Sequence, residues 1–502
     1  MSIPEDLKIC LIIPPSSFLM DERVFPSLGV LKIAAILEKY GKPVDVLDLS
    51  GVQNYTDVIA EYIHSFKPTI CGISTTTPQL PAVIKIAKEI TKHACNIKKI
   101  LGGPHVTLTL SAFLYEKAHQ IENGRAASAL SHLQEIFDVL VSGDGELSIL
   151  EAVAPNAPAI IDADSNGSPY FMSNAVYNKS PTPARHFIDL ESYKYEIEGH
   201  KATSLIAQLG CPFSCGFCGG RHSRSLRVPR TRDTETIINE IEFLYATYGY
   251  TGFMFFDDEL NVNRKNFIVL LSELKSLQDR LGVNFRLRGF VKAELFDETQ
   301  AIAMYEAGFR WLLCGFEAAD PRILLNIQKR ATREDNERAV QAAKKAGLKV
   351  KALMSCGHPG ETENSINSIQ EWLINNDVDD FDCTVITPYP GTPYHDEARQ
   401  EHKQKNIWTY AAPATSDKLY SYEVDFINDP QYYKGDPDGG YKSFVYTDYL
   451  SSEEIVTLRG WVEETVREKL NIAYPTGRAA LQFEHSMGQG IPSKMLRSSL
   501  KK

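Results

Sequence analysis

The chain is predicted to be an α/β protein that begins with a doubly wound parallel sheet. Short apolar segments alternate with segments of helical spacing over the first 150 residues, and a second series of such β/α repeats follows residue 200. This alternation is typical of parallel strands joined by helical crossovers, whose ligands bind beyond the carboxyl ends of the strands. A length of 502 residues also exceeds one ordinary domain.

The first region contains five expected strands with helices between them. The strands are short apolar runs that end at turn-forming residues, at 8–13, 43–47, 69–74, 97–101 and 138–141. Helical spacing predicts helices at 27–40, 58–66 and 81–93. Pro-Pro-Ser-Ser at 14–17 stands where a Gly-x-Gly-x-x-Gly fingerprint would follow the first strand, so a nicotinamide cofactor is not expected.

The rest of the chain divides into three further parts. Residues 155–200 have weak periodicity and several prolines, which is typical of a connector. Strand patterns resume at 204–209, 252–256, 284–288, 310–316, 349–355 and 381–387. After residue 400 the chain is rich in tyrosine, with a helical pattern at 452–470. We therefore divide the chain into 1–154, 155–200, 201–400 and 401–502, and expect the last part to be a mainly α-helical cap.

Composition excludes several classes of function. A formal charge of −11 argues against nucleic acid as a partner. No apolar stretch approaches the roughly 18 residues of a membrane span, so integral membrane association is not expected. The nine cysteines are odd in number and mostly isolated within apolar segments, as expected of buried thiols in a reducing compartment. The protein is therefore expected to be cytoplasmic.

The most informative motif lies at residues 210–218, which read Gly-Cys-Pro-Phe-Ser-Cys-Gly-Phe-Cys. Its Cys-x3-Cys-x2-Cys spacing can place Cys211, Cys215 and Cys218 around one metal centre at the end of a strand. A cubane cluster held by three cysteines leaves one iron open to another ligand. A zinc site is the alternative, because His222 follows at the right distance to complete a Cys3His set.

The cysteine spacing, with the aromatic Phe217 before the last cysteine, resembles the signature of the radical S-adenosylmethionine (SAM) enzymes. The resemblance implies a 4Fe–4S cluster whose open iron chelates the amino and carboxylate groups of SAM and cleaves it to a 5′-deoxyadenosyl radical. It also implies that residues 201–400 form a partial (β/α)6 barrel of the TIM type. The active site then lies at the carboxyl ends of its strands.

Three more barrel segments are similar to this family. Polar residues after the second strand face the SAM amino group in the family, which implies Asp257 or Asp258 here, with helix capping as the other interpretation. Arg288 ends the third expected strand and would clamp the methionine carboxylate, and Arg286 on the same face is the alternative. Glu317 lies in Gly-Phe-Glu-Ala, which matches the family's Gly-x-Glu-Ser except for the last residue, and is implied to hold the ribose hydroxyls.

Two later loops complete the expected barrel site. Residues 357–362 read Gly-His-Pro-Gly-Glu-Thr, close to a family turn beside the adenine, and Glu361 is expected to cap the next helix. His358 is a candidate catalytic residue that contacts substrate or transfers a proton, with a structural hydrogen bond as the alternative. Tyr389 also matches the family and is expected to lie over the cofactor as a second candidate catalytic residue.

The first domain resembles the cobalamin-binding domain that precedes many radical enzymes, on the stretches 26–31, 72–77, 102–105 and 143–146. Glycines let the backbone approach the corrin, and hydroxyls can bond its nucleotide tail. The chain has no Asp-x-His-x-x-Gly after the first strand, so cobalamin is implied to bind without a protein histidine on cobalt. His105 is expected to structure its loop. The implied cobalamin contacts are Ser74, Thr75, Thr76, Gly102, Gly103, Gly143 and Glu146.

Together the two resemblances imply a cobalamin-dependent radical SAM enzyme. Its expected reaction transfers a methyl group from SAM, via methylcobalamin, to an unactivated carbon of a small molecule or natural product. An external electron donor of the flavodoxin or ferredoxin type is implied as a partner. One alternative uses the same cofactors for cyclisation, oxidation or rearrangement without methyl transfer. The other is a non-catalytic cobalamin or iron–sulfur sensor.

Overall fold

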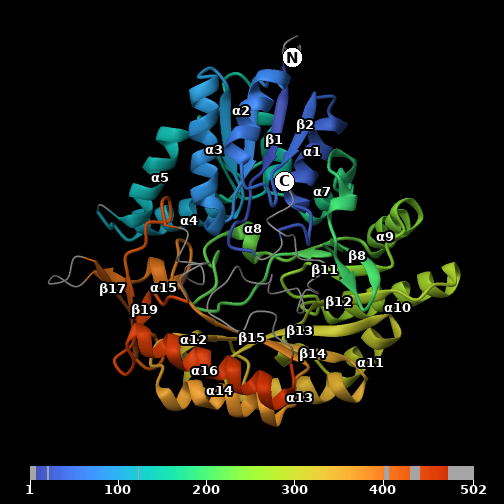
Figure 1. Cartoon of the computed structure of the whole chain (residues 1–502), viewed down its shortest axis with the longest axis vertical. Helices are drawn as coiled ribbons and strands as arrows, with labels where there is room; N and C mark the ends of the chain where they lie inside the picture. Colours follow the sequence, from blue (N-terminus) through green and yellow to red (C-terminus); the bar gives the residue numbers. More distant parts are fainter. Residues whose placement is uncertain (1–6, 20–21, 123, 401–405, 430–440, 473–502) are drawn as a thin grey trace.

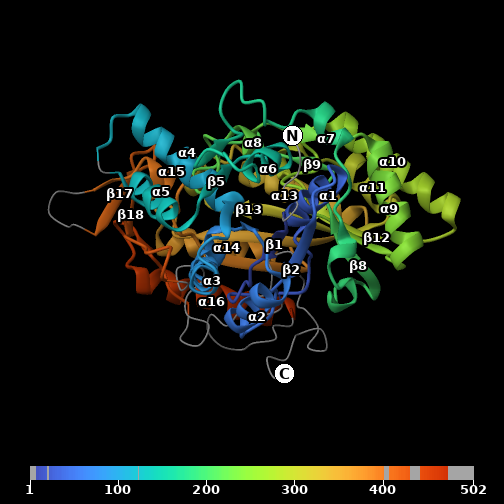
Figure 2. The same ribbon diagram turned by 90° about the horizontal axis from the view of Figure 1, so that it is seen from above.

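The computed structural model describes residues 7–19, 22–122, 124–400, 406–429 and 441–472. The first 150 residues form one unit in the upper half of Figure 1, and the barrel strands with their helices form the lower half. Figure 2 shows α9 and α10 at one end of the molecule and β17 and β18 at the other. No helix within the described residues is both long and apolar enough to cross a membrane.

The first sheet has six parallel strands in the order β2-β1-β3-β4-β5-β6. All five residues of β1 are buried, because alternate side chains pack against helices on the two faces of the sheet. Helices α1 and α6 cover one face and α2, α3, α4 and α5 the other, which confirms the doubly wound prediction. The strands are β1 (Ile9–Ile13), β2 (Val44–Asp48), β3 (Ile70–Ser74), β4 (Lys98–Gly102), β5 (Val139–Ser142) and β6 (Ile160–Asp162). The helices are α1 (Leu28–Lys39), α2 (Tyr55–Phe66), η1 (Thr77–Gln79), α3 (Leu80–His93), α4 (Pro104–Ala118), α5 (Arg125–Ile136) and α6 (Gly145–Ala152).

The second sheet has six parallel strands, β8 and β11 to β15, with the short β7 antiparallel to β8 at its edge. Long helices cover its outer face and share one apolar core with it, as expected of a partial barrel. The strands are β7 (Glu196–Ile197), β8 (His200–Leu205), β11 (Gly252–Phe255), β12 (Arg286–Phe290), β13 (Phe309–Glu317), β14 (Lys349–Cys356) and β15 (Asp380–Val385). The covering helices are α9 (Thr234–Tyr248), α10 (Arg264–Leu281), α11 (Glu298–Glu306), α13 (Arg333–Lys345) and α14 (Glu363–Asn375).

Shorter elements connect the two sheets and carry the loops of the barrel. Val24 and Phe25, which precede α1, pack with Tyr195 and Met254 on the inner face of the barrel. The first region therefore contributes side chains to the barrel interior. The connecting elements are α7 (Asn174–Lys179), η2 (Arg185–Phe187), η3 (Leu190–Ser192), β9 (Gln208–Leu209), α8 (Arg224–Arg227), β10 (Arg230–Thr231), η4 (Ala293–Leu295), α12 (Pro321–Ile327) and α15 (Pro393–Asp396).

The described part of the C-terminal region differs from the expected, mainly α-helical cap. It contains an antiparallel sheet of β16 (Arg399–Gln400), β17 (Ile407–Ala411), β18 (Lys418–Tyr422) and β19 (Val445–Tyr446), followed by the predicted helix α16 (Ser452–Leu470). Tyrosine and other aromatic residues favour strands, which explains the sheet. Helix α16 lies along the edge strand β15, where Arg459 donates to the Cys383 carbonyl oxygen (2.7 Å). The helix thereby supplies a hydrogen-bond donor to the backbone at the open edge of the barrel sheet.

Candidate active site

The cysteine loop, residues 210–220, follows β8 and starts on the antiparallel pair of β9 with β10. Gly210 has a φ of +84°, and a Cβ atom there would lie 2.4 Å from the Val228 carbonyl oxygen, so only glycine fits. The Cys211 N–H donates to the Leu226 carbonyl oxygen at the end of α8 (2.9 Å). The backbone at Gly210 and Cys211 therefore packs directly against the backbone of residues 226–228.

The three thiols face a space that is open and yet deep within the protein. Cys218 is exposed, and Cys211 and Cys215 are partly exposed. Burial nevertheless raises the pKa of Cys211 to about 11 and raises the pKa of Cys218 well above its ordinary range. These thiols are thus accessible to solvent although many protein atoms surround them.

The chemistry of this donor set fits an iron–sulfur cluster. The carboxyls of Glu259 and Asp258 and the Cys215 thiol further raise the Cys211 pKa, so a bound cation favours the Cys211 thiolate here. Among the described residues, no three metal-binding side chains converge closely enough for a single ion. Iron–sulfur clusters are held by cysteine thiolates, which these three residues supply. His222, which a zinc site would need, instead stacks on Tyr115 with ring centroids 5.0 Å apart.

The acidic residues after β11 have different tasks from those expected. Asp257 accepts hydrogen bonds from the backbone N–H groups of Ala207 and Gln208, and burial raises its pKa to about 7. Its carboxylate therefore joins the ends of β11 and β8, whereas its contact with SAM stays a prediction. Asp258 accepts the Gly210 N–H at 2.9 Å and positions the start of the cysteine loop.

Glu259, which we did not single out from the sequence, is a better candidate for a ligand contact. Its buried Oε2 has no hydrogen-bond partner within the described residues, and burial raises the pKa of the carboxyl to about 7. The nearby cations Lys329 and Lys292 oppose this rise and favour the charged form. The only sequence signal for it is its place directly after Asp257 and Asp258.

Arg288 lies in the middle of β12 and not at its end, as the sequence had suggested. Its side chain is 1% exposed, and its Nη1 donates to the Tyr195 hydroxyl at 3.0 Å. Its Nε and Nη2 have no acceptor among the described residues. Arg286, the alternative on the same face, instead approaches Glu198 (Nε to Oε2, 3.4 Å). Arg288 is therefore the guanidinium with unused donors.

A chain of hydrogen bonds joins the ends of β13 and β14. Lys329 Nζ donates to Glu317 Oε1 (3.2 Å), and Ser355 Oγ donates to Glu317 Oε2 (2.8 Å). Ser355 also bonds Nε2 of His358 (2.8 Å), whose Nδ1 bonds the Tyr394 hydroxyl (3.3 Å). Glu317 sits at a φ of +67°, a strained position for a residue other than glycine. Lys329, Ser355 and Tyr394 carry no sequence signal that would have identified them.

His358, a candidate catalytic residue with a structural hydrogen bond as the alternative, lies inside this hydrogen-bonded chain. It is completely buried, both ring nitrogens are bonded, and burial lowers its pKa to about 3. These contacts favour the structural alternative. Phe217 packs edge-to-face on its ring at 5.5 Å, so this hydrogen-bonded chain ends against the cysteine loop. Tyr389 also lies at the loop, since a Cβ atom on Gly219 would be 3.2 Å from its hydroxyl.

A second site lies at the carboxyl ends of β3, β4 and β5, where a cavity of about 300 Å³ opens. We call it the glycine-lined cavity. Its deep part is apolar, with Leu11, Ile100 and Ile149 among its lining residues. Five of the seven residues predicted to contact cobalamin also line it. These are Ser74, Gly102, Gly103, Gly143 and Glu146.

The glycines of this cavity are required for its shape. Gly103 has a φ of +93°, and a Cβ atom there would lie 2.6 Å from Ser74 Oγ and 2.7 Å from the Thr75 nitrogen. A Cβ atom on Gly102 would meet nothing closer than Val141 at 3.7 Å, an ordinary van der Waals contact, so this position has room for a small side chain. An apolar slot with a bare backbone wall fits the flat nucleotide tail of cobalamin.

Thr75 and Thr76 do not line the cavity, contrary to the prediction. The Thr75 hydroxyl donates to the Thr76 carbonyl oxygen (2.8 Å), and the Thr76 hydroxyl donates to Gln79 Oε1 (3.0 Å). Both hydroxyls are used within their own loop, where Thr76 and Gln79 form the capping box of η1. Hydroxyls beside a helix start prefer this local use to a ligand.

Comparison with known proteins agrees with both sites. The family model "Radical SAM superfamily" matches residues 205–373, and the model "B12 binding domain" matches residues 22–133. An uncharacterized methyltransferase of Pyrococcus horikoshii is 30% identical over 77% of this chain and 82% of its own length. The chain belongs to the cobalamin-binding radical SAM family. Its cofactors are accordingly a 4Fe–4S cluster, SAM and cobalamin.

Other members of this radical SAM family are more distant. The hopanoid C-3 methylase of Methylococcus capsulatus is 22% identical over 76% of this chain and 71% of its own length. The solved structure of the radical SAM methyltransferase TsrM from Kitasatospora setae, with cobalamin and a cluster bound, has a TM-score of 0.66, 17% identity and 91% coverage of both chains. The cobalamin-dependent enzyme OxsB has a TM-score of 0.56 and 14% identity, covering 75% of this chain and 53% of its own. These structures share the fold of this radical SAM protein.

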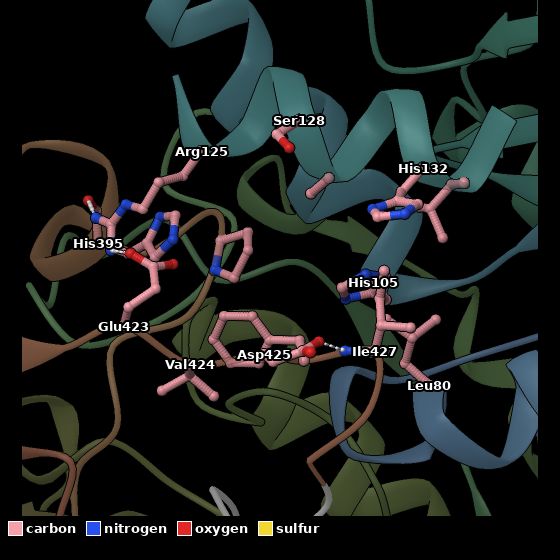
Figure 3. Close-up of a pocket in the computed structure, with 14 residues that line it drawn as sticks. Leu80, His105, Arg125, Ser128, His132, His395, Glu423, Val424, Asp425 and Ile427 are labelled. Carbon is pink, nitrogen blue, oxygen red and sulfur yellow. Dashed lines mark hydrogen bonds and ion pairs between the residues drawn. The ribbon is translucent and has the colours of Figure 1, made fainter. Parts of the chain in front are cut away.

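His105 of this radical SAM protein lies away from the glycine-lined cavity. Its ring bonds the hydroxyls of Thr77 (3.1 Å) and Thr109 (3.4 Å), and burial lowers its pKa to about 4. This confirms its expected structural role. Figure 3 shows it at a smaller cavity of about 160 Å³, beside residues of α5 such as His132 and the segment 423–427.

Proposed function

We propose that this protein is a cobalamin-dependent methyltransferase that methylates an unactivated carbon of a small molecule. One observation carries the proposal. The glycine-lined cavity and the cysteine loop adjoin, because Leu209 and Leu226 both line the cavity. Leu209 lies two residues before Cys211, and the Leu226 carbonyl oxygen accepts a hydrogen bond from the Cys211 N–H. Two cofactor sites this close suit a reaction in which both cofactors act on one substrate.

The three cysteines would hold the cluster, and the glycine-lined cavity would hold the cobalamin tail. When bound, the cluster supplies the electron that cleaves SAM to a hydrogen-abstracting radical, and cobalamin supplies the methyl group. The protein's own part is to bind and orient the reactants and to exclude water.

Charged groups around the cysteine loop would orient SAM. We assign Glu259 to its ammonium group, because the buried Oε2 of this residue lacks a partner within the described residues. Arg288 retains two unused donors for a carboxylate, and Glu317, fixed by Lys329 and Ser355, would accept from the ribose hydroxyls. Asp258 would act indirectly, by holding the backbone of Gly210.

The remaining partners follow from the same chemistry. A small-molecule substrate would enter between the two domains, and an external flavodoxin or ferredoxin would supply the electron in the cytoplasm. The expected coenzyme product is 5′-deoxyadenosine, with one methyl group gained by the substrate.

The test is an anaerobic reconstitution with iron, sulfide and hydroxocobalamin, followed by desalting and spectroscopy. Retained corrin and cluster absorbance is expected, with 5′-deoxyadenosine formed from SAM under reductant. Cys215→Ala should abolish both the cluster and SAM cleavage, whereas Cys95→Ala, an exposed cysteine outside the motif, should leave them intact. Full SAM cleavage by Cys215→Ala would refute the proposal. A product without an added methyl group would instead indicate cyclisation or oxidation, and corrin binding without 5′-deoxyadenosine would indicate a sensor.

A further inference from the structure

One wall of the glycine-lined cavity is built by the barrel and not by the first domain. We call it the barrel-side wall; it consists of Leu209, Ser225, Leu226 and Arg230. Leu209 pairs with Arg230 in the β9–β10 ladder, and the Leu226 carbonyl oxygen accepts the Cys211 N–H at 2.9 Å. The backbone that positions the first cysteine is thus also a surface of the cobalamin cavity.

Arg230 joins this wall to the first domain. Its side chain is 2% exposed, and its Nη1 donates to both carboxylate oxygens of Asp144 (2.6 and 2.5 Å). Its Nη2 donates to the Ser225 carbonyl oxygen within the wall. Asp144 also accepts the Met172 N–H at 2.9 Å. A charge pair buried on both sides holds its geometry firmly, since loss of either partner leaves an uncompensated charge.

The guanidinium of Arg230 also has one donor without an acceptor among the described residues. Its Nε is buried and has no hydrogen-bond partner among the described residues. Buried donors are nearly always satisfied in proteins, by protein, water or ligand. Arg230 lines the glycine-lined cavity, and cobalamin carries amide oxygens around its ring and a phosphodiester in its tail, which are acceptors of the kind that a guanidinium binds.

We propose that Arg230 is a positioning residue that couples the two cofactor sites, so that cobalamin and the cluster each bind more tightly when the other is present. The inference rests on the proposed assignment of the glycine-lined cavity to cobalamin. Cobalamin fixes the barrel-side wall by contact with Arg230 and its neighbours. A fixed wall holds Leu226 and therefore Cys211 in place for the cluster, and the thermodynamic effect is reciprocal.

The coupling is measured on the full chain by titrating hydroxocobalamin anaerobically into the protein with and without its reconstituted cluster. Corrin absorbance gives the dissociation constant, and we expect it to be at least about fivefold lower when the cluster is present. The reciprocal measurement is the loss of cluster absorbance to an iron chelator, which should be slower by a similar factor with cobalamin bound. In Arg230→Gln, the cluster should change the cobalamin dissociation constant by less than twofold, and cobalamin should change the rate of cluster loss by less than twofold.

Arg224→Gln is the matched control. Arg224 belongs to the same segment and also lies over the Phe171 ring (4.1 Å, against 5.2 Å for Arg230). It bonds the Ser165 carbonyl oxygen and is not among the residues that line the glycine-lined cavity. Its replacement should leave the coupling at the wild-type value.

The outcomes separate the inference from the proposed function. Equal cobalamin affinity with and without the cluster in the wild type would overturn the coupling but not the assignment of the cavity. Absence of any cobalamin binding would overturn the assignment and the coupling together. If Arg230→Gln does not fold, Arg230→Lys keeps a cation beside Asp144 but loses the contact with the Ser225 carbonyl oxygen, and wild-type coupling in that variant would refute the inference.

Discussion

Filling the glycine-lined cavity from Gly102 should remove cobalamin binding while leaving the fold intact. Gly102 is the last residue of β4, its φ is not positive, and a Cβ atom would find nothing closer than 3.7 Å. Overpacking a fitted site by a few methyl groups costs about 1–3 kcal/mol. Because 1.4 kcal/mol is tenfold in affinity, Gly102→Val should raise the cobalamin dissociation constant by about 5- to 150-fold, and Gly102→Ala by less.

The neighbouring glycine provides the contrast for this experiment. Gly103→Ala forces a Cβ atom within 2.6 Å of Ser74 Oγ and 2.7 Å of a backbone nitrogen, at a φ of +93°. A positive φ with an extended ψ costs a residue other than glycine about 1–3 kcal/mol, so the melting temperature should fall. Thermal unfolding without cofactors and hydroxocobalamin titration distinguish the two effects. Wild-type cobalamin affinity in a folded Gly102→Val variant would refute the assignment of the cavity.

Three further changes test the barrel. Burial raises the Glu361 pKa to about 7, so the protonated carboxyl contributes fully to stability below pH 4.5, and this contribution is lost as pH rises through 7. The free energy of unfolding in urea should therefore fall by about 3 kcal/mol over this range in the wild type, and should not fall in Glu361→Gln. His358→Phe should destabilise the fold by about 2 kcal/mol, since two buried hydrogen bonds disappear, and should alter the electron paramagnetic resonance spectrum of the reduced cluster through Phe217. Glu240→Gln weakens two buried arginine pairs and should cost about 3 kcal/mol in thermal unfolding, whereas Glu242→Gln, in an exposed pair, should change little. An unchanged pH profile, cluster spectrum or melting temperature, respectively, would contradict each expectation.

The sequence predicted the backbone of the site better than its side chains. Strand ends, glycine turns and the cysteine spacing are local patterns, and the structure places Ser74, Gly102 and Gly143 around one cavity as expected. The partner of a side chain, in contrast, comes from distant segments. Asp257 is used by N–H groups some fifty residues earlier in the chain, and no local pattern reveals that pairing.

The same reason applies to His358. His358 stands in a turn that matches the family, and the match gives its position along the chain but not its environment. Its burial depends on Tyr394, which lies thirty-six residues later and occupies one ring nitrogen. The C-terminal sheet was missed because its strands are short and irregularly spaced, so that only the long period of α16 gave a clear pattern.

The shared wall also gives a physical reason for joining these two domains in one chain. The glycine-lined cavity takes its floor from the first sheet and its remaining wall from residues that follow the barrel's first strand. Neither half alone encloses a ligand, and contact between halves of one chain is intramolecular, so it forms at a high effective concentration. The buried pair of Arg230 with Asp144 then holds the two halves together where the glycine-lined cavity adjoins the cysteine loop. A substrate carbon held beyond this wall would face both sites without moving between them, as methyl transfer after hydrogen abstraction requires.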